Sequence, residues 1–156
     1  MAGVRPSVLI GHLALALALG AIVVGHLLLI PLLCANTALV DANLARALSE
    51  PLALRCGELV LAGCVLAALA SKRWLAHRAG LTLSLVAVGV AAIDRLVLIP
   101  ELHQAWGRVD LVAMRPLARI EVAEQLTLVH QASLGAMVVA LVGLGALAAI
   151  DRKLGS

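Results

Sequence analysis

Four uninterrupted apolar runs are the feature of this sequence that most constrains its fold. They cover about residues 7–33, 51–70, 80–99 and 123–150. Each is long enough for an α-helix to cross the ~30 Å hydrocarbon core of a bilayer, because a helix rises about 1.5 Å per residue. The runs are continuous and not alternating, which excludes the strands of a transmembrane β-barrel. The sequence therefore predicts a single-domain, all-α integral membrane protein, folded as an antiparallel four-helix transmembrane bundle.

The composition excludes several classes of protein. Hydrophobic residues make up 63% of the chain and charged residues only 13%, whereas soluble domains average about 45–50% and about 25%. Phe and Tyr are absent and Trp occurs twice, so the chain lacks aromatic platforms on which nucleic-acid bases stack. These values exclude a soluble enzyme, a disordered segment and a nucleic-acid-binding module. The expected partner is the lipid bilayer, with other membrane subunits or a second copy of the chain as further candidates.

Basic residues cluster on one side of the expected bundle. The connection over residues 71–79 contains Lys72, Arg73 and Arg78 and no acidic residue. Basic residues also flank both ends of the chain, whereas the other two connections mix charges of both signs. Because the cytoplasmic loops of membrane proteins carry an excess of Lys and Arg, we expect both termini in the cytoplasm and the protein in the inner membrane of a bacterium.

The two connections on the opposite, outer side have features of their own. Residues 34–50 are expected to form an outer loop with a short amphipathic helix on the membrane surface, preceded by a polar cap at Asn36. Pro116 is well placed as the first residue of a helix, so the fourth helix is expected over residues 116–150. The two indoles are expected in loops at opposite membrane interfaces, where Trp is enriched; they are Trp74 and Trp106.

The three cysteines form no recognisable motif. Cys34 and Cys56 are both expected near the outer ends of their helices, where an oxidising compartment permits a disulfide bridge. Their pairing cannot be deduced from the sequence and is left open. Cys64 falls in the middle of the second helix and is expected to be a small apolar filler.

Four ionisable residues lie at one depth within the expected helices. His26, Glu58, Asp94 and His130 come from four different helices, each about 8–11 Å below the outer boundary when residues are counted from the helix ends. Ionisable side chains inside a membrane are costly and are candidates for function. Two imidazoles and two carboxylates that face one another would hold a transition metal ion such as zinc, copper or iron. The residues expected to support this set are Arg55, Arg95, Glu124 and Ser133.

A purely structural interpretation of the same residues stays open. Arg55 precedes Glu58 by three residues and Arg95 adjoins Asp94, so each acid would form an ion pair near the membrane interface. Polar groups buried in a membrane usually pair with one another, and such a network needs no cofactor.

One b-type haem between His26 and His130 is the other cofactor that the sequence allows. His12 and His26 would face the same way on a straight α-helix, as in helices that carry ligands for two stacked haems. The corresponding inner position in the fourth helix is Leu144, which cannot ligate iron. The two-haem arrangement is therefore excluded, and a single haem remains.

Three stretches of the sequence carry a family resemblance. They are G-A-I-V-V-G-H-L-L-L-I-P-L-L-C at 20–34, I-D-R-L-V-L-I-P-E-L-H at 93–103 and E-Q-L-T-L-V-H-Q-A-S at 124–133. Proline closes the expected first and third helices, and an H-x-x-S motif opens the fourth; these positions are Pro31, Pro100, His130 and Ser133. The chain thus resembles a family of small four-helix bacterial membrane proteins, a domain of unknown function related to vertebrate transmembrane protein 205. The resemblance implies no established activity, but the vertebrate members are associated with tolerance of metal-containing drugs, which implies metal handling.

Three classes of function therefore remain. A metal- or haem-binding membrane protein would depend on His26 and His130. A non-catalytic accessory subunit of a larger membrane complex would need little internal chemistry. An exporter of small solutes or metal ions would need a polar path through both halves of the bundle, and the inner half offers only His12 and Ser84 within the spans. The spacing of residues forces no nucleophile–base pair and no open metal triad, so the sequence does not by itself indicate an enzyme.

Overall fold

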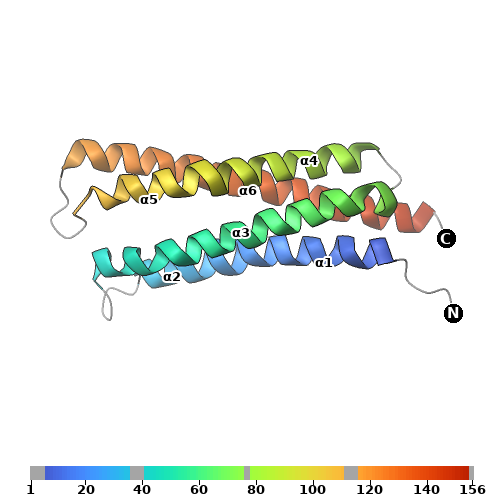
Figure 1. Ribbon diagram of the computed structural model, residues 1–156, viewed down its shortest axis with the longest axis horizontal. Coiled ribbons are helices and arrows are strands. Elements are labelled where there is room, and N and C mark those ends of the chain that lie inside the picture. Colours follow the sequence, from blue (N-terminus) through green and yellow to red (C-terminus); the bar gives the residue numbers. More distant parts are fainter. Residues whose placement is uncertain (1–5, 36–40, 76–77, 111–115, 155–156) are drawn as a thin grey trace.

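The computed structural model describes residues 6–35, 41–75, 78–110 and 116–154, and these residues are almost entirely helical. The elements are α1 (Pro6–Gly20), η1 (Ala21–Leu29), α2 (Ile30–Ala35), α3 (Ala42–Trp74), α4 (Arg78–Ile93), η2 (Asp94–Leu98), α5 (Ile99–Gly107) and α6 (Leu117–Leu154). The π-helical stretches η1 and η2 join α1 to α2 and α4 to α5 without a break. The described chain therefore forms four rods, namely α1–η1–α2, α3, α4–η2–α5 and α6 (Figure 1).

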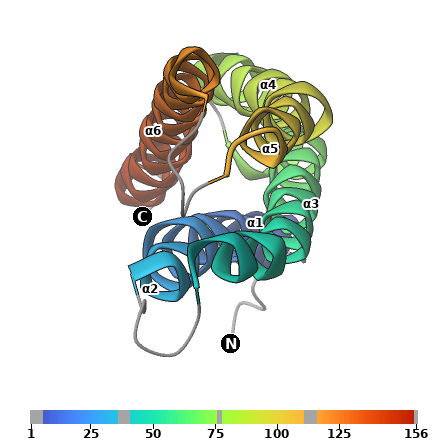
Figure 2. The same cartoon turned by 90° about the vertical axis from the view of Figure 1, so that its left-hand side faces the viewer.

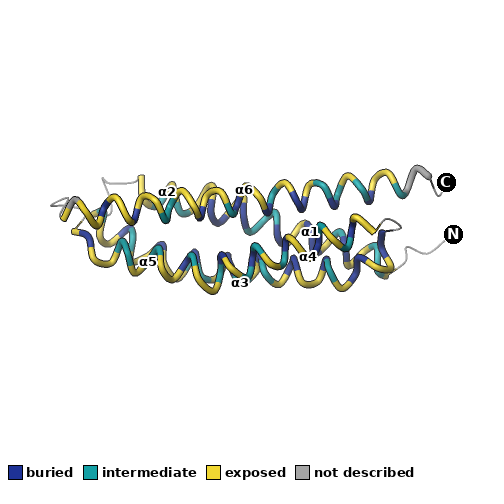
Figure 3. The backbone as a smooth tube through the Cα atoms, turned by 90° about the horizontal axis from the view of Figure 1, so that it is seen from above, coloured by how far each residue is buried: buried dark blue, intermediate teal, exposed yellow. Residues whose placement is uncertain are grey.

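Each of the four rods is long and apolar enough to cross a membrane. Within the described residues the candidate spans are Pro6–Ala35, Ala42–Trp74, Arg78–Gly107 and Ala118–Asp151. Exposed residues, many of them Leu and Val, follow the outside of the rods along their whole length, and buried residues face inward (Figure 3). An apolar outer surface of this kind is compatible with a lipid environment. The prediction of an all-helical chain with four long apolar helices is confirmed.

The four rods lie side by side along one long axis. The chain runs to and fro along this axis, so that its N- and C-terminal ends lie at the same end of the molecule (Figure 1). α1 packs along α3, α3 along α4, and α4 along α6, as the end-on view shows (Figure 2). The core between them is built largely from small residues, among them Ala18, Ala67, Ala87 and Ala140.

Small residues set the distance between α1 and α3. A Cβ atom added at Gly63 would lie 2.9 Å from the carbonyl oxygen of Ala14 and 2.9 Å from Ala18 Cβ. The first of these neighbours is backbone, so rotation of a side chain would not relieve the contact. Gly63 therefore permits the close approach of two helices that small residues provide in membrane proteins.

The π-helical stretches lie directly before the two prolines that were expected to close the first and third helices. In each, the N–H of the residue before the proline bonds to the carbonyl five residues earlier, which is Gly25 in η1 and Asp94 in η2. Proline lacks an N–H, and in an α-helix its ring clashes with the carbonyl four residues earlier. The wider π turns accommodate Pro31 and Pro100, and both rods continue beyond them.

The second helix begins earlier than the sequence predicted. The carboxylate of Asp41 caps α3 by accepting hydrogen bonds from two backbone N–H groups of the first turn, at 2.8 and 3.0 Å. Residues 34–50 were expected as an outer loop with a short surface helix, but residues 42–50 are the first turns of α3, which continues through Pro51. Asn36, the expected cap of that surface helix, lies outside the described residues.

The two tryptophans are also placed differently from the prediction. The third rod extends to Gly107 and not to residue 99, so Trp106 lies within α5. Trp74 is the last residue of α3, and it is buried with its ring centroid 5.2 Å from that of His12. Both indoles therefore belong to helices and not to loops.

α6 begins directly after Pro116, within one residue of the expected start.

Replacing Gly63 with Ala should destabilise the protein, because the new methyl group would press on the backbone of α1. Overpacking of this kind typically costs about 1–3 kcal/mol. The matched control is Gly89→Ala, since a Cβ at Gly89 meets no atom within 4 Å, and Ala there raises helix propensity. Thermal unfolding in detergent should show a lower midpoint for Gly63→Ala and an unchanged or higher midpoint for Gly89→Ala. Equal midpoints would contradict the close approach of α1 and α3.

Candidate functional site

A buried polar cluster joins the third and fourth rods. His130 Nδ1 lies 2.8 Å from Asp94 Oδ1, and the Ser133 hydroxyl is placed to donate a hydrogen bond to the same oxygen. Asp94 is only 2% exposed and His130 is 8% exposed. Ser133 follows His130 by three residues on α6, so the two side chains lie on one helix face and reach a single carboxylate. The arrangement fixes the orientation of the His130 imidazole.

His26, in η1 of the first rod, contacts this cluster. Its ring centroid lies 5.2 Å from that of His130, with an edge-to-face angle of 60° between the rings. His26 is 7% exposed, and its Nε2 atom is buried without a hydrogen-bond partner. Unpartnered buried nitrogen atoms are uncommon because the lost hydration is not replaced. Nε2 of His26 is therefore a buried nitrogen that is free to form a hydrogen bond or to bind a metal ion.

The separation of the two imidazoles distinguishes between the cofactors considered above. Two imidazoles bound to one tetrahedral metal ion have ring centroids about 5 Å apart, given metal–nitrogen distances near 2 Å. A haem held by two histidines needs them on opposite faces of the macrocycle. Because the rings of His26 and His130 meet edge to face, no macrocycle fits between them. The geometry therefore fits an ion better than a haem.

The described residues do not complete a metal site by themselves. They contain no group of three or more His, Cys, Asp or Glu side chains placed to hold one ion. Asp94 accepts a hydrogen bond from His130. A carboxylate in this position orients a metal-ligating imidazole and is not itself a ligand of the ion. An ion at His26 and His130 would take its remaining ligands from the adjoining cavity.

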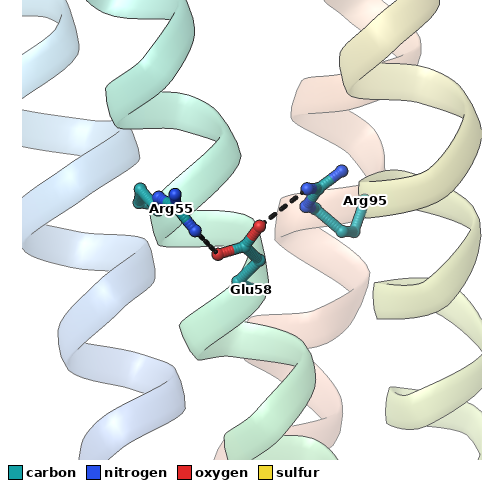
Figure 4. A network of polar contacts seen from close by, with 3 residues as sticks. All are labelled: Arg55, Glu58 and Arg95. Carbon is teal, nitrogen blue, oxygen red and sulfur yellow. Dashed lines mark hydrogen bonds and ion pairs between the residues drawn. The ribbon is translucent and has the colours of Figure 1, made fainter.

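Glu58 lies apart from the other three members of the expected set. Its two carboxylate oxygens pair with Arg55 Nη1 at 2.7 Å and Arg95 Nη2 at 2.8 Å (Figure 4). The side chains of Arg55 and Glu58 are 79% and 43% exposed, so this network lies on the outside of the bundle. Successive helix residues point about 100° apart; Asp94 therefore faces the core, while Arg95 faces α3 and pairs with Glu58.

Glu124 differs from its expected supporting role, and the question of a bridge between Cys34 and Cys56, which the sequence left open, is answered by the structure. Glu124 is exposed, and its position six residues before His130 places it on another face of α6. Cys34 is exposed and Cys56 is buried, and both are free thiols, so the structure has no bridge between them. His12 packs against Trp74 at the far end of the bundle, whereas His26 contacts His130.

A cavity of about 780 Å³ adjoins the histidine cluster and is lined by all four rods. His26 and His130 both contribute to its wall, as does His103 of α5, whose Nε2 atom is likewise buried and without a partner. Arg46 of α3 closes one side, since its guanidinium donates hydrogen bonds to the carbonyl oxygens of His103, at 2.9 Å, and of Trp106. These carbonyls lie near the C-terminal end of α5, where a cation is favourable.

His103 and Arg46 belong to the wall of the cavity but were not in the expected set. Because the third helix was expected to end at residue 99, the sequence predicts His103 near the outer surface, as a solvated residue or an alternative ligand. Ile99, His103 and Trp106 are spaced four and three residues apart, which is the spacing of one inward-facing helix surface. That spacing was a usable signal for His103. Arg46 left no comparable signal, because its role depends on the third rod extending past Pro100.

Comparison with protein-family models, with curated proteins and with solved structures finds no match for this chain. The resemblance to the four-helix family related to transmembrane protein 205 therefore remains a prediction.

Replacing Asp94 with Ala should destabilise the protein, because His130 Nδ1 would lose its buried partner, whereas the Ser133 hydroxyl would keep the His130 carbonyl oxygen as an acceptor at 2.8 Å. Leaving buried polar groups unsatisfied typically costs about 1–3 kcal/mol. Asp94→Asn keeps an acceptor oxygen and should cost less. Glu58→Ala is the matched control in the exposed network and should lower the free energy of unfolding least. Thermal unfolding in detergent measures the stability of all three variants. A larger drop in the unfolding midpoint for Glu58→Ala than for Asp94→Ala would contradict the conclusion that the buried cluster stabilises the protein more than the exposed network.

Proposed function

We propose that the chain is a multi-pass protein of the bacterial inner membrane, in which the four rods form an antiparallel transmembrane bundle with both termini in the cytoplasm. The termini and the connection between α3 and α4 lie at one end of the molecule. Lys72, Arg73 and Arg78 are exposed at that end, as cytoplasmic positive charge requires. The histidine cluster then belongs to the outer half of the bundle.

Labelling with a membrane-impermeant maleimide tests this orientation. Cys34 is exposed at the end of α2, opposite the termini, so a variant that retains only Cys34 should be labelled in intact cells. A variant with Lys72→Cys as its single cysteine should be labelled only after the inner membrane is permeabilised. Labelling of the Lys72→Cys variant in intact cells would reverse the proposed orientation.

We further propose that His26 and His130 bind one transition metal ion. The observation that carries this proposal is the unpartnered, buried Nε2 atom of His26 beside an imidazole whose orientation is fixed. When the Nδ1–H of His130 donates a hydrogen bond to Asp94, Nε2 of His130 keeps its lone pair for an ion. Neutral imidazole is a common ligand of zinc, copper and iron. The remaining coordination positions would open into the cavity, where water or a bound molecule can fill them.

Metal titration of the detergent-purified protein tests this proposal. One equivalent of Zn²⁺ or Co²⁺ should bind, and the absorbance spectrum should show no Soret band. His26→Ala and His130→Ala should abolish stoichiometric binding, and Asp94→Asn should weaken it roughly 10- to 100-fold, as is usual for residues that orient a ligand. His12→Ala is the matched control, because His12 lies at the other end of the bundle, and it should bind as the unaltered protein does. A Soret band that depends on His26 would favour haem instead.

A non-catalytic accessory subunit is the second candidate, and a different observation favours it. The Arg55–Glu58–Arg95 network carries a surplus positive charge on the outer surface of the bundle, and ionised groups that face lipid are costly unless another protein covers them. Under this proposal a further membrane subunit or a second copy of the chain packs over Glu58. The unaltered protein would then bind no metal in the titration, and both histidine variants would behave like it.

A further inference from the structure

The cavity adjoins a gap in the backbone packing between the first and fourth rods. α1 contacts α6 along its length nearer the termini, and α5 packs against α6. By contrast η1 and α2 make almost no backbone contact with α6, and α2 and α6 stand apart on one side in the end-on view (Figure 2). The cavity wall contains residues from both sides of this gap, including Leu27 and Ile30 of the first rod and Gln131 and Leu134 of α6.

On the first rod the exposed residues beside this gap are apolar, whereas Gln131 of α6 is polar and exposed. Leu27 lines the cavity and is also exposed on the outside, and Leu28, its neighbour in the sequence, is exposed as well. A molecule that passes between these residues would come from a hydrocarbon phase and not from water. This step rests on the proposed membrane location of the bundle, but not on the proposed metal ion.

The interior of the cavity combines apolar walls with two unsatisfied imidazole nitrogens. Ile99, Leu102 and Leu134 supply apolar surface, and the Nε2 atoms of His26 and His103 lack hydrogen-bond partners. The His103 backbone carbonyl is held by Arg46. A ligand that fits this wall has an apolar body and hydrogen-bonding oxygen atoms. The volume of about 780 Å³ falls in the range of small-molecule sites, about 300–1,000 Å³.

The wall of the cavity carries one permanent charge. Among the described lining residues this charge belongs to Arg46. Each of its terminal nitrogens donates a hydrogen bond, one to the carbonyl of Trp106 and one to that of His103, whereas its Nε atom is buried without a partner. A carbonyl oxygen can accept a hydrogen bond from such a donor or from a free imidazole N–H, and an anionic lipid headgroup is the competing occupant that the displacement experiment below distinguishes.

We infer that this cavity binds a lipid-soluble quinone, which enters from the membrane between the first and fourth rods and accepts a hydrogen bond from His103 Nε2 through a carbonyl oxygen. The flat ring lies among the apolar side chains of α5 and α6. The tail extends through the gap beside Leu27 into the lipid. The tautomer of His103 with a proton on Nε2 is the one required for this bond.

The two tryptophans of the chain make this proposal measurable by fluorescence. Trp106 lines the cavity, whereas Trp74 packs against His12 at the opposite end of the bundle. The probe is a benzoquinone with a decyl tail, because quinones quench indole fluorescence, and the metal-free protein is used in detergent with a chelator. The Trp74→Phe variant, which retains Trp106, should show saturable quenching at one equivalent. The Trp106→Phe variant should show only the weak, non-saturating quenching caused by quinone dissolved in the micelle.

Variants of the cavity wall, made in the Trp74→Phe background, extend the test. His103→Phe should raise the apparent dissociation constant roughly tenfold through loss of one hydrogen bond, and His103→Gln, which retains a donor, should restore most of the affinity. Ala53→Phe should abolish saturable quenching by filling the cavity, since Ala53 is a buried part of its wall. Ala62→Phe is the matched control, because Ala62 is exposed on the same helix, and it should leave quenching unchanged.

Three results would overturn the inference. Equal, non-saturating quenching of Trp74 and Trp106 would show that no site exists, and saturable quenching that is indifferent to both His103→Phe and Ala53→Phe would place the site elsewhere. Displacement of the probe by one equivalent of phosphatidylglycerol would assign the cavity to a lipid headgroup. Failure of metal binding would leave the quinone result untouched, because the chelator removes the ion from this experiment. The two proposals therefore fail separately.

Discussion

The buried hydrogen bond between Asp94 and His130 is the interaction on which the organisation of this site depends. It joins the third and fourth rods in a region where most neighbouring side chains are apolar. In such surroundings a polar group that loses its partner finds no water to replace it. The bond therefore favours one rotation of α6 about its axis, namely the rotation that points His130 at Asp94 and at His26. Ser133 adds a second donor to the same carboxylate and strengthens that preference.

The two prolines determine how these side chains reach the centre. Each follows a π-helical stretch that lets its rod continue without the missing backbone hydrogen bond. The extra residue per turn also changes the direction in which the local side chains point. His26 lies within η1 and Asp94 begins η2, so two members of the cluster owe their orientation to this local change of helix. The third rod then continues past Pro100 and carries His103 and Trp106 to the wall of the cavity.

The cavity results from an imbalance in packing between the two ends of the bundle. Near the termini small residues such as Gly63 and Ala18 let the rods approach closely. At the other end the first rod packs on α3 but stands away from α6, and the ring contact of His26 with His130 spans the interval. A metal ion between the imidazoles and a ring-shaped lipid behind them would both use space that protein side chains leave open. The exposed arginine–glutamate network lies outside this space, on the surface of α3.

The sequence by itself determined the helical class of the chain, the number of long apolar helices and the fact that His26, Asp94 and His130 share one level, but not the depth of that level, because the second and third rods extend further than expected. These properties follow from residue counts, because each helical residue advances the chain by about 1.5 Å whatever its neighbours are. The tertiary structure decided which side chains face the centre. Successive residues of a helix point about 100° apart, and each π turn shifts these directions again. Which residues face the centre therefore depends on how each rod packs against the others. For this reason Glu58 was expected in the cluster but pairs with Arg55 and Arg95 on the surface, whereas His103 was expected at the surface but lines the cavity.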